Sequence, residues 1–408
     1  MNPSIHVPHL DDEERVGRRR GRSAIALLVA AVLLLGLSLS VPGVSATPTS
    51  PEDAAFYARQ WNLHAINAAT AWEGGYLGDK DVRVAVIDTG IDYEHPDLVG
   101  RVDLSEDGSV SLLSMSCPGG EPGTPALKAE IARADDDGVR QFMDYHSHGT
   151  AVAGLIASNA QWLAGVTQRT TLIAIKVNAA TTMRQNCLSV YLAAIHEAIE
   201  RDADVIHLSF PVEFNATQFP GAVERINRAM HDAHRSGAVI VAAAGNTGAV
   251  VDPDSTQFRF CNAHHVLCVS GTAPTAAAGD EGPWEEPDTF WPMSNFGPAI
   301  DVAGPAGTMS VPHSQVWLLC SRHATAPGRP CTESDAIWSS TGTSFAAAAT
   351  SGLAAQLVAI VGPDKPAKVV GIIRGTAEDL GAPGWDEFYG EGFIDVGAAV
   401  DLAAKQVK

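Results

Sequence analysis

Four polar side chains stand where nucleophilic catalysis would need them. They are Asp88 after an apolar run (AVIDTGIDYEHPDL), His148 at the start of a helical pattern (HSHGTAVAGLIA), Asn246 after another apolar run (AAAGN) and Ser344 at the head of an Ala-rich pattern (SSTGTSFAAAA). A serine hydroxyl is a weak nucleophile unless a neighbouring base takes its proton, and a neutral imidazole suits that role near pH 7. A carboxylate would orient the imidazole, and an amide would stabilise the oxyanion. Together they predict acyl transfer by a nucleophilic serine.

Each of these signals is weak by itself. An Asp at a strand end is more often a turn former, a His at a helix start is more often structural, and a Ser before a helix is most often an N-cap. The conjunction is far more specific, because it supplies a nucleophile, a base, an orienting carboxylate and an amide donor in the chain order Asp, His, Ser. An esterase of the α/β-hydrolase class is disfavoured, since it would need GxSxG and the order Ser, acid, His, whereas residues 342–346 read GTSFA.

Short apolar runs rich in Val and Ile alternate with helical patterns along the chain. The predicted buried strands are residues 82–87, 171–177, 204–210, 238–244 and 265–271, and the predicted helices are 188–201, 222–236 and 344–360. Near-continuous hydrophobicity in strands is typical of a parallel sheet covered on both faces, so we expect an α/β fold with a mostly parallel central sheet between helices. Asp88 and Asn246 then follow strands at the carboxyl edge, where such folds build their sites. No repeat or Pro-rich linker divides residues 79–408, which we expect to form one domain behind an N-terminal arm, 47–78.

Composition excludes one class of partner. Acidic residues outnumber basic ones 47 to 27, which gives a formal charge of −20, so polyphosphate would be repelled and nucleic acid is not an expected ligand. With 46% hydrophobic residues in 408, the chain can bury a large core.

The N-terminus has the pattern of a targeting segment. Residues 1–22 end in a basic cluster, residues 24–41 carry no charge, and Val44-Ser45-Ala46 resembles a secretory cleavage site. Two interpretations remain open for residues 23–46, a cleaved signal peptide or an uncleaved membrane anchor, because the apolar run is about long enough to span a bilayer. The basic cluster favours keeping residues 1–22 in the cytoplasm. Either way the remainder is predicted to be secreted or extracytoplasmic.

Six cysteines lie in the part predicted to be exported: Cys117, Cys187, Cys261, Cys268, Cys320 and Cys331. An even number in an oxidising compartment favours disulfides over metal ligation, for which a close CxxC pair is lacking. The sequence does not choose among the connectivities. Short spacing favours Cys261 with Cys268 and Cys320 with Cys331, which leaves Cys117 with Cys187.

At the four candidate residues the sequence resembles the subtilisin-like serine peptidases, the subtilases of peptidase family S8. Three signature segments match in order, and the likeness runs from about Gln60 to the closing YGEGFIDVGAAVDLA. The resemblance implies a three-layer subtilisin-like fold and a serine endopeptidase acting on peptides or proteins. It also implies that Ser344 is the nucleophile, His148 the general base and Asp88 its orienting carboxylate. Asn246 would be the oxyanion donor, and no cofactor is required for this chemistry.

The resemblance also assigns a substrate-binding region. Its matching residues are Ser209, Phe210, Pro211, Ala242, Ala243, Ala244, Gly245 and Gly271. The small side chains among them predict an open, apolar specificity pocket. Pro211 departs from the family pattern, which has small glycines here, and proline has no N–H to donate to a bound peptide. This departure keeps a second interpretation open, a catalytically silent or zymogen-like peptide-binding protein on the same fold.

Subtilases often bind structural calcium, and Asp97 in HPDL matches a family calcium ligand. Asp53 is a looser candidate, and for both the alternative is a solvated surface carboxylate. The acidic run 135–137 is interpreted as a solvated loop.

Two histidine pairs have the spacing of metal ligands. They are His146 with His148 and His231 with His234, but the sequence shows no third ligand, so zinc is disfavoured.

Overall fold

The central element is a seven-stranded sheet with the order β11-β8-β6-β4-β1-β3-β2. A computed structural model describes residues 50–115, 117, 125–180, 187–210, 212–325, 331 and 336–407. The strands of this sheet are β1 (Arg83–Asp88), β2 (Val110–Ser111), β3 (Thr171–Lys176), β4 (Val205–Leu208), β6 (Val239–Ala243), β8 (Val266–Thr272) and β11 (Val302–Pro305). Every neighbouring pair is parallel. The five predicted strands correspond to β1, β3, β4, β6 and β8 within one or two residues, and the predicted α/β class is confirmed.

Both faces of the sheet are buried, as its apolar strands require. Side chains alternate across a strand, so in β1 Val84 and Val86 join one hydrophobic cluster and Ala85 and Ile87 join the other. The two largest hydrophobic clusters of the described residues therefore lie on opposite faces of one sheet.

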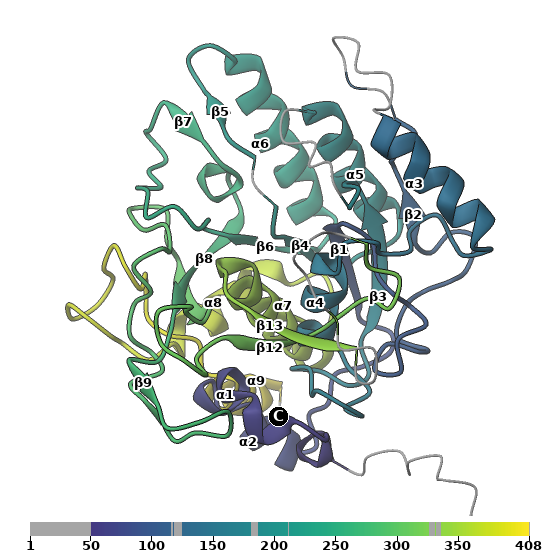
Figure 1. The fold of residues 1–408 in the computed structure, drawn as a ribbon. Helices are drawn as coiled ribbons and strands as arrows, with labels where there is room; N and C mark the ends of the chain where they lie inside the picture. The colour runs from purple at the N-terminus through teal and green to yellow at the C-terminus, as the bar shows by residue number, and fades with distance from the viewer. Residues whose placement is uncertain are drawn as a thin grey trace, which may run out of the picture. The chain divides into compact units, whose positions relative to one another are not determined.

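Helices cover each face and complete three layers (Figure 1). On one face lie α5 (Leu188–Glu200) and α6 (Pro220–Arg235). The opposite face carries α4 (His148–Ile156), α7 (Thr343–Val361), α8 (Pro366–Gly375) and α9 (Val396–Val407). A further helix, α3 (Pro125–Asp136), lies beside β2 in the long segment between Asp88 and His148. The acidic run 135–137 is exposed as predicted, but Asp135 and Asp136 belong to α3 rather than to a loop.

Helix α7 is the central helix of the core. Among the described residues it is the one helix whose 19-residue length and apolar composition would suffice to cross a membrane, but 89% of its apolar window is buried inside the fold. The predicted membrane or signal segment, residues 24–41 within 23–46, lies outside the described residues, as does the basic region 1–22.

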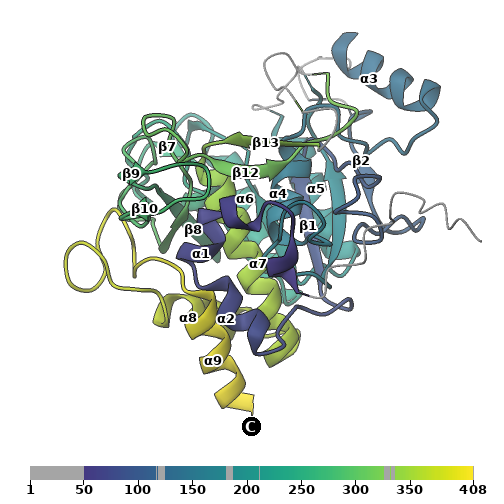
Figure 2. The ribbon, with the colours of Figure 1, turned by 60° about the horizontal axis from the view of Figure 1, so that its bottom comes forward.

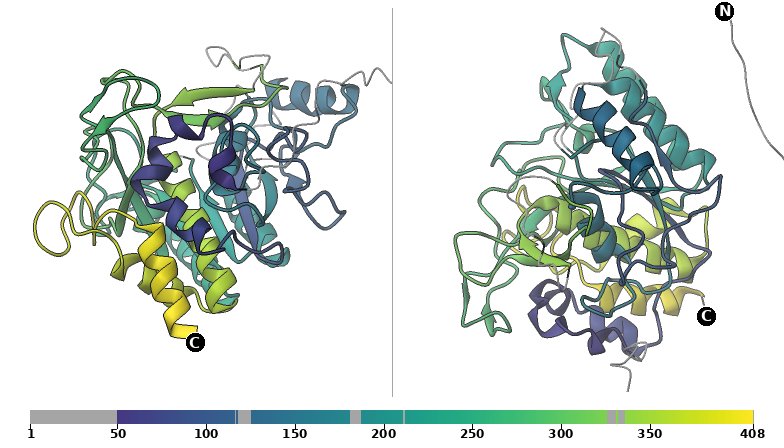
Figure 3. Two further views of the ribbon diagram at one scale, coloured as in Figure 1. Left: turned by 90° about the horizontal axis from the view of Figure 1, so that it is seen from below. Right: turned by 45° about the vertical axis from the view of Figure 1, so that its right-hand side comes forward.

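The segment before β1 is built into the same core. It contains the short turns η1 (Pro51–Asp53) and η2 (Tyr57–Arg59) and the helices α1 (Trp61–Ala65) and α2 (Ala68–Glu73). The ring N–H of Trp72 donates to the carbonyl of Val166 at 2.9 Å, and the Gln60 side chain exchanges two hydrogen bonds with the backbone of Ala164. In Figures 2 and 3 this purple segment lies against α7 and α9.

Three two-stranded ladders lie outside the central sheet, and each is antiparallel. They are β5 (Phe214–Asn215) with β7 (Gln257–Phe258), β9 (Ala276–Ala277) with β10 (Trp284–Glu285), and β12 (Val316–Leu319) with β13 (Ile337–Ser340). A 3-10 turn, η3 (Phe260–Asn262), follows β7.

The cysteines form three disulfides, Cys117–Cys187, Cys261–Cys268 and Cys320–Cys331. This is the pairing that the spacing favoured. The first ties the segment after β2 to the start of α5, the second joins η3 to β8, and the third closes the loop between β12 and β13.

Candidate active site

Asp88 and His148 form the best-defined polar contact at the carboxyl edge of the sheet. Asp88 ends β1 and is buried, and His148 begins α4. Nδ1 of His148 lies 2.9 Å from both carboxylate oxygens of Asp88, which also accepts bonds from the N–H of Thr89 and the hydroxyl of Ser209. Burial by itself would raise the pKa of Asp88, but the charge and hydrogen bond of His148 and the Thr89 N–H lower it to about 2. Asp88 is therefore a carboxylate at neutral pH and fixes the ring.

Ser344 lies in the first turn of α7 and is nearly buried. Its hydroxyl donates to the backbone carbonyl of Ser209 at 3.2 Å. The ring of the next residue, Phe345, has its centroid 6.1 Å from that of His148, which brings the start of α7 beside the imidazole. Ser209 therefore contacts both Asp88, through its hydroxyl, and Ser344, through its carbonyl.

Asn246 follows β6 and is oriented by Thr343, the residue before Ser344. Oδ1 of Asn246 accepts bonds from the N–H of Thr343 at 2.9 Å and from its hydroxyl at 2.8 Å. The N–H of Gly245 donates to the same hydroxyl at 3.0 Å. Because Oδ1 is occupied, the NH₂ end of the amide remains as the donor beside Ser344.

A cavity of about 410 Å³ adjoins Ser344 and Asn246. Its other lining residues are Leu208, Ser209, Phe210, Val212, Glu213, Ala243, Ala244, Gly245, Thr247, Arg259, Phe260, Asn295 and Thr343. Ala242 and Gly271, also expected to bind substrate, are outside this lining. Ala242 points into the core beneath β6, and Gly271 is covered by Ala306 and Thr343. Pro211 lies outside the described residues.

The cavity contains small residues that predict an apolar pocket, and it also contains a pair of charged side chains. Phe214 in β5 pairs with Phe258 in β7, so the neighbouring residues Glu213 and Arg259 face each other across this ladder. Nη2 of Arg259 lies 3.0 Å from Oε1 of Glu213, and both line the cavity. The sequence does not predict this ion pair, because Glu213 and Arg259 are far apart in the sequence and become neighbours only when β5 and β7 pair.

The family model for the subtilase family matches residues 79–392. The chain belongs to the subtilase family. It is 29% identical over 259 residues to the thermophilic serine proteinase of Bacillus sp. (strain AK1), covering 63% of this chain and 51% of that protein. It is 27% identical over 274 residues to the major intracellular serine protease of Bacillus subtilis (strain 168), covering 65% of this chain and 70% of that protein. The match thus spans about half the length of the first of these relatives.

Solved structures share the subtilase fold. A lanthipeptide protease superposes with a TM-score of 0.64 at 21% identity and covers 86% of this chain and 94% of its own. The epidermin leader peptide processing serine protease of Staphylococcus aureus superposes with a TM-score of 0.66 at 19% identity, covering 86% and 83%. Both confirm the predicted three-layer fold.

Asp97, which matches a calcium ligand of the subtilases, is surrounded by hydrogen-bond donors. Its buried carboxylate accepts the backbone N–H groups of Gln161 at 2.5 Å, Trp162 at 3.1 Å and Leu163 at 3.1 Å. Calcium needs six to eight oxygen ligands, whereas these N–H groups direct positive partial charge at the same oxygens. The donor set therefore does not fit calcium, and Asp97 fixes the loop after α4 directly. The looser candidate, Asp53, accepts the N–H of Ser50 as part of the η1 cap.

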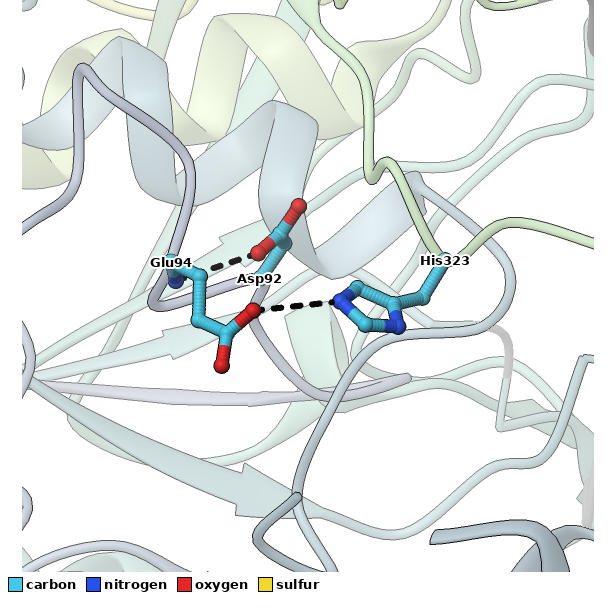
Figure 4. A group of neighbouring side chains, drawn as sticks. All are labelled: Asp92, Glu94 and His323. Carbon is cyan, nitrogen blue, oxygen red and sulfur yellow. Dashed lines mark hydrogen bonds and ion pairs between the residues drawn. The ribbon is translucent and has the colours of Figure 1, made fainter. Parts of the chain in front are cut away.

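One acidic cluster brings three ligand-type side chains together within the described part of the chain. Asp92, Glu94 and His323 place their ligand atoms within 4.8 Å of one another (Figure 4). Arg322, however, donates to both oxygens of Asp92 and lies 3.6 Å from Glu94. Its guanidinium supplies the positive charge that a metal ion would bring, so this cluster is an ion-pair network.

The histidine pairs do not form a convergent metal site. His231 contacts His265 with 3.4 Å between nitrogens, but the ring of His234 stacks on His265 with centroids 4.3 Å apart. Stacked rings hold their nitrogens in parallel planes and cannot both point at one ion. The ring of His146 lies 6.3 Å from that of His148, which is bound to Asp88.

Thr343, Arg259 and Glu213 are residues of the cavity lining that were not identified from the sequence. Thr343 precedes the nucleophile in GTS, so its position was a usable signal. No local pattern marks Arg259 or Glu213 as pocket residues.

Proposed function

We propose that this chain is an exported serine endopeptidase that cleaves peptide bonds through an acyl-enzyme, with Asp88, His148 and Ser344 as its catalytic triad. The observation that carries the proposal is the contact of His148 Nδ1 with both oxygens of buried Asp88, at the sheet edge where Ser344 and Asn246 adjoin one cavity.

The geometry supports a defined role for each group. Asp88 holds the proton on Nδ1 of His148, which leaves the Nε2 lone pair to accept the proton of Ser344. The hydroxyl must first leave the carbonyl of Ser209, and hydrogen bonds of this kind are often unaligned until substrate binds. Ser344 Oγ then attacks the carbonyl carbon, and His148 returns the proton to the leaving amine.

The oxyanion would be stabilised at the start of α7. The NH₂ of Asn246 and the backbone N–H of Ser344 are the donors, and the helix N-terminus adds a favourable dipole. Water attacks the acyl-enzyme by the same steps in reverse. The relatives named as serine proteinase and serine protease support this assignment.

The second candidate function is a catalytically silent peptide-binding protein. The hydrogen bond from the Ser344 hydroxyl to the Ser209 carbonyl favours this second function, because a serine held in that bond does not react.

Export rests on the targeting pattern of residues 1–46 and on the three disulfides, which persist in oxidising compartments. N-terminal sequencing of the chain recovered from the producing cells, after fractionation, distinguishes a new N-terminus at Thr47, which indicates cleavage, from an intact membrane-bound chain. Full-length protein in the cytosol would contradict export.

Labelling with a fluorophosphonate serine probe tests the triad. We expect labelling of Ser344 in the full chain, none in Ser344→Ala or His148→Ala, and unchanged labelling in the exposed-serine control Ser310→Ala. An absence of labelling in folded protein with its disulfides intact would overturn the proposal and favour the binding protein.

A further inference from the structure

The cavity beside Ser344 has an ion pair in its lining, and this feature carries an inference that rests on the proposed function. Arg259 and Glu213 are the charged residues of its described lining, which they share with the small residues Ala243, Ala244 and Gly245. A side chain of the substrate that enters this cavity must therefore meet an ion pair.

The two charges are not equivalent. The side chain of Arg259 is 14% exposed, whereas that of Glu213 is 49% exposed. Arg259 is also held by its backbone, since its N–H donates to the Asn262 side chain at 2.6 Å at the start of η3. The guanidinium is thus the more buried group of the pair, and the carboxylate of Glu213 is the more hydrated one.

The guanidinium of Arg259 makes few contacts within the described residues. A guanidinium carries five N–H groups. Arg259 uses one nitrogen for Glu213 and has a long contact of 3.5 Å from another to the carbonyl of Val250. Two other arginines of this chain each contact two carboxylates, Arg322 with Asp92 and Glu94, and Arg374 with Asp301 and Glu391. Among the described residues Arg259 pairs with one carboxylate, and it lines the cavity.

We propose that this cavity selects an acidic side chain, Glu or Asp, at the substrate residue whose carbonyl Ser344 attacks, and that Arg259 is the specificity-determining residue. The substrate carboxylate becomes the second partner of the guanidinium. A lysine or arginine would meet a like charge, and its attraction to Glu213 is already offset by Arg259. A large apolar side chain would desolvate the ion pair without replacing its lost hydration.

The test compares kcat/KM of the full chain for peptides that differ only in the residue before the cleaved bond, which is Glu, Gln, Leu or Lys. We expect Glu to be preferred over Gln and Leu by about 10- to 100-fold, the range for a hydrogen bond to a charged group. Arg259→Gln should remove that preference while the Leu peptide changes by no more than a few-fold. The control is Arg225→Gln, an exposed arginine on α6 outside the cavity, which should behave as wild type.

Glu213→Gln provides a second variant if Arg259→Gln does not fold. Removing the competing carboxylate should strengthen the preference for Glu. A wild-type preference for Leu or Lys, or an equal loss for all peptides in Arg259→Gln, would overturn the inference while leaving the peptidase assignment intact.

Binding separates the pocket from the chemistry. Calorimetry with the Ser344→Ala chain and acetylated peptides ending in Glu, Leu or Lys measures the pocket without catalysis, and we expect the Glu peptide to bind most tightly. Tight Glu binding with no probe labelling of wild-type Ser344 would reject the peptidase and keep the pocket. Equal binding of the three peptides would reject the pocket whatever the labelling shows.

Discussion

The hydroxyl of Thr343 donates a 2.8 Å hydrogen bond to Oδ1 of Asn246, so the residue before the candidate nucleophile orients the candidate oxyanion donor. The same hydroxyl accepts the N–H of Gly245, which leaves the amide little freedom to flip.

Thr343→Val should therefore lower kcat with little change in KM, because the donor is needed only once negative charge develops. We expect kcat to fall by about 10-fold, which corresponds to the free energy of one neutral hydrogen bond. Asn246→Ala removes the donor itself and should cost about 10²- to 10³-fold in kcat.

The double variant distinguishes positioning from packing. Thr343→Val should add little once Asn246 is Ala, since nothing remains to be oriented. The exposed Thr256→Val is the control. If the losses in kcat of the two single variants multiply in the double variant, Thr343 acts through a group other than Asn246.

The stability of the fold should depend on the ionisation of Asp88. Burial opposes the charge, but His148 and the Thr89 N–H lower the pKa of this carboxyl to about 2 from an ordinary value near 3.8. A depressed folded-state pKa contributes stability that is present above the unfolded value and is lost as pH falls from about 4 to about 2. Asp88→Asn has no such group to titrate.

We expect the free energy of unfolding of wild type to fall relative to Asp88→Asn by about 2 kcal/mol across that window, measured by urea denaturation in a series of buffers. Asp88→Asn should also lose most of its activity at neutral pH, because the amide favours the wrong imidazole tautomer. If the free energies of unfolding of the two proteins change equally with pH in this window, the low pKa assigned to Asp88 is contradicted.

Features that depend on residues close together in the sequence could be predicted, whereas contacts between residues far apart in the sequence could not. Asp88, Asn246 and Ser344 lie at ends of strongly apolar elements, so local periodicity located them, and the parallel sheet follows from strands such as β1 that bury both faces. The pocket charge could not be found this way. Glu213 and Arg259 become neighbours only through the two-residue ladder of β5 and β7, which is too short to leave a hydrophobic pattern.

The surroundings of Asp97 could not be predicted for a related reason. Asp97 has the right type and place for a calcium ligand, but its role is decided by the loop that faces it, and residues 161–163 present N–H groups. Backbone orientation has no signature in residue types.

Asp97 should stabilise the fold without calcium. Asp97→Ala leaves three N–H groups without their acceptor, of which that of Leu163 is buried, and we expect a loss of about 1 to 3 kcal/mol in the free energy of unfolding. Millimolar calcium should not restore it, and a chelator should leave the melting temperature of wild type unchanged.

Calorimetric melting with and without chelator measures both effects, with the exposed loop variant Asp254→Ala as the control. A chelator-dependent drop in the melting temperature of wild type, reversed by calcium, would show that the chain has a calcium site after all.

Glu130 and Lys176 join helix α3 to the central sheet through a buried ion pair. Oε1 of Glu130 lies 2.6 Å from Nζ of Lys176, whose side chain is fully buried and also donates to the carbonyl of Met143. Oε2 of Glu130 accepts the N–H of Ala180 at 2.7 Å. This pair therefore anchors the long segment between Asp88 and His148 to β3.

Glu130→Ala should be strongly destabilising, since it leaves an ammonium group in the core without its counter-charge. The expected loss is about 3 to 5 kcal/mol in the free energy of unfolding. The double variant Glu130→Leu with Lys176→Met removes both charges and should recover most of that loss, because an apolar pair of similar size avoids the desolvation of two ions. Asp136→Ala, at an exposed position on the same helix, is the matched control. Denaturation with urea measures all four proteins, and a double variant no more stable than Glu130→Ala would show that the hydrogen bonds to Met143 and Ala180, rather than the paired charges, hold α3 in place.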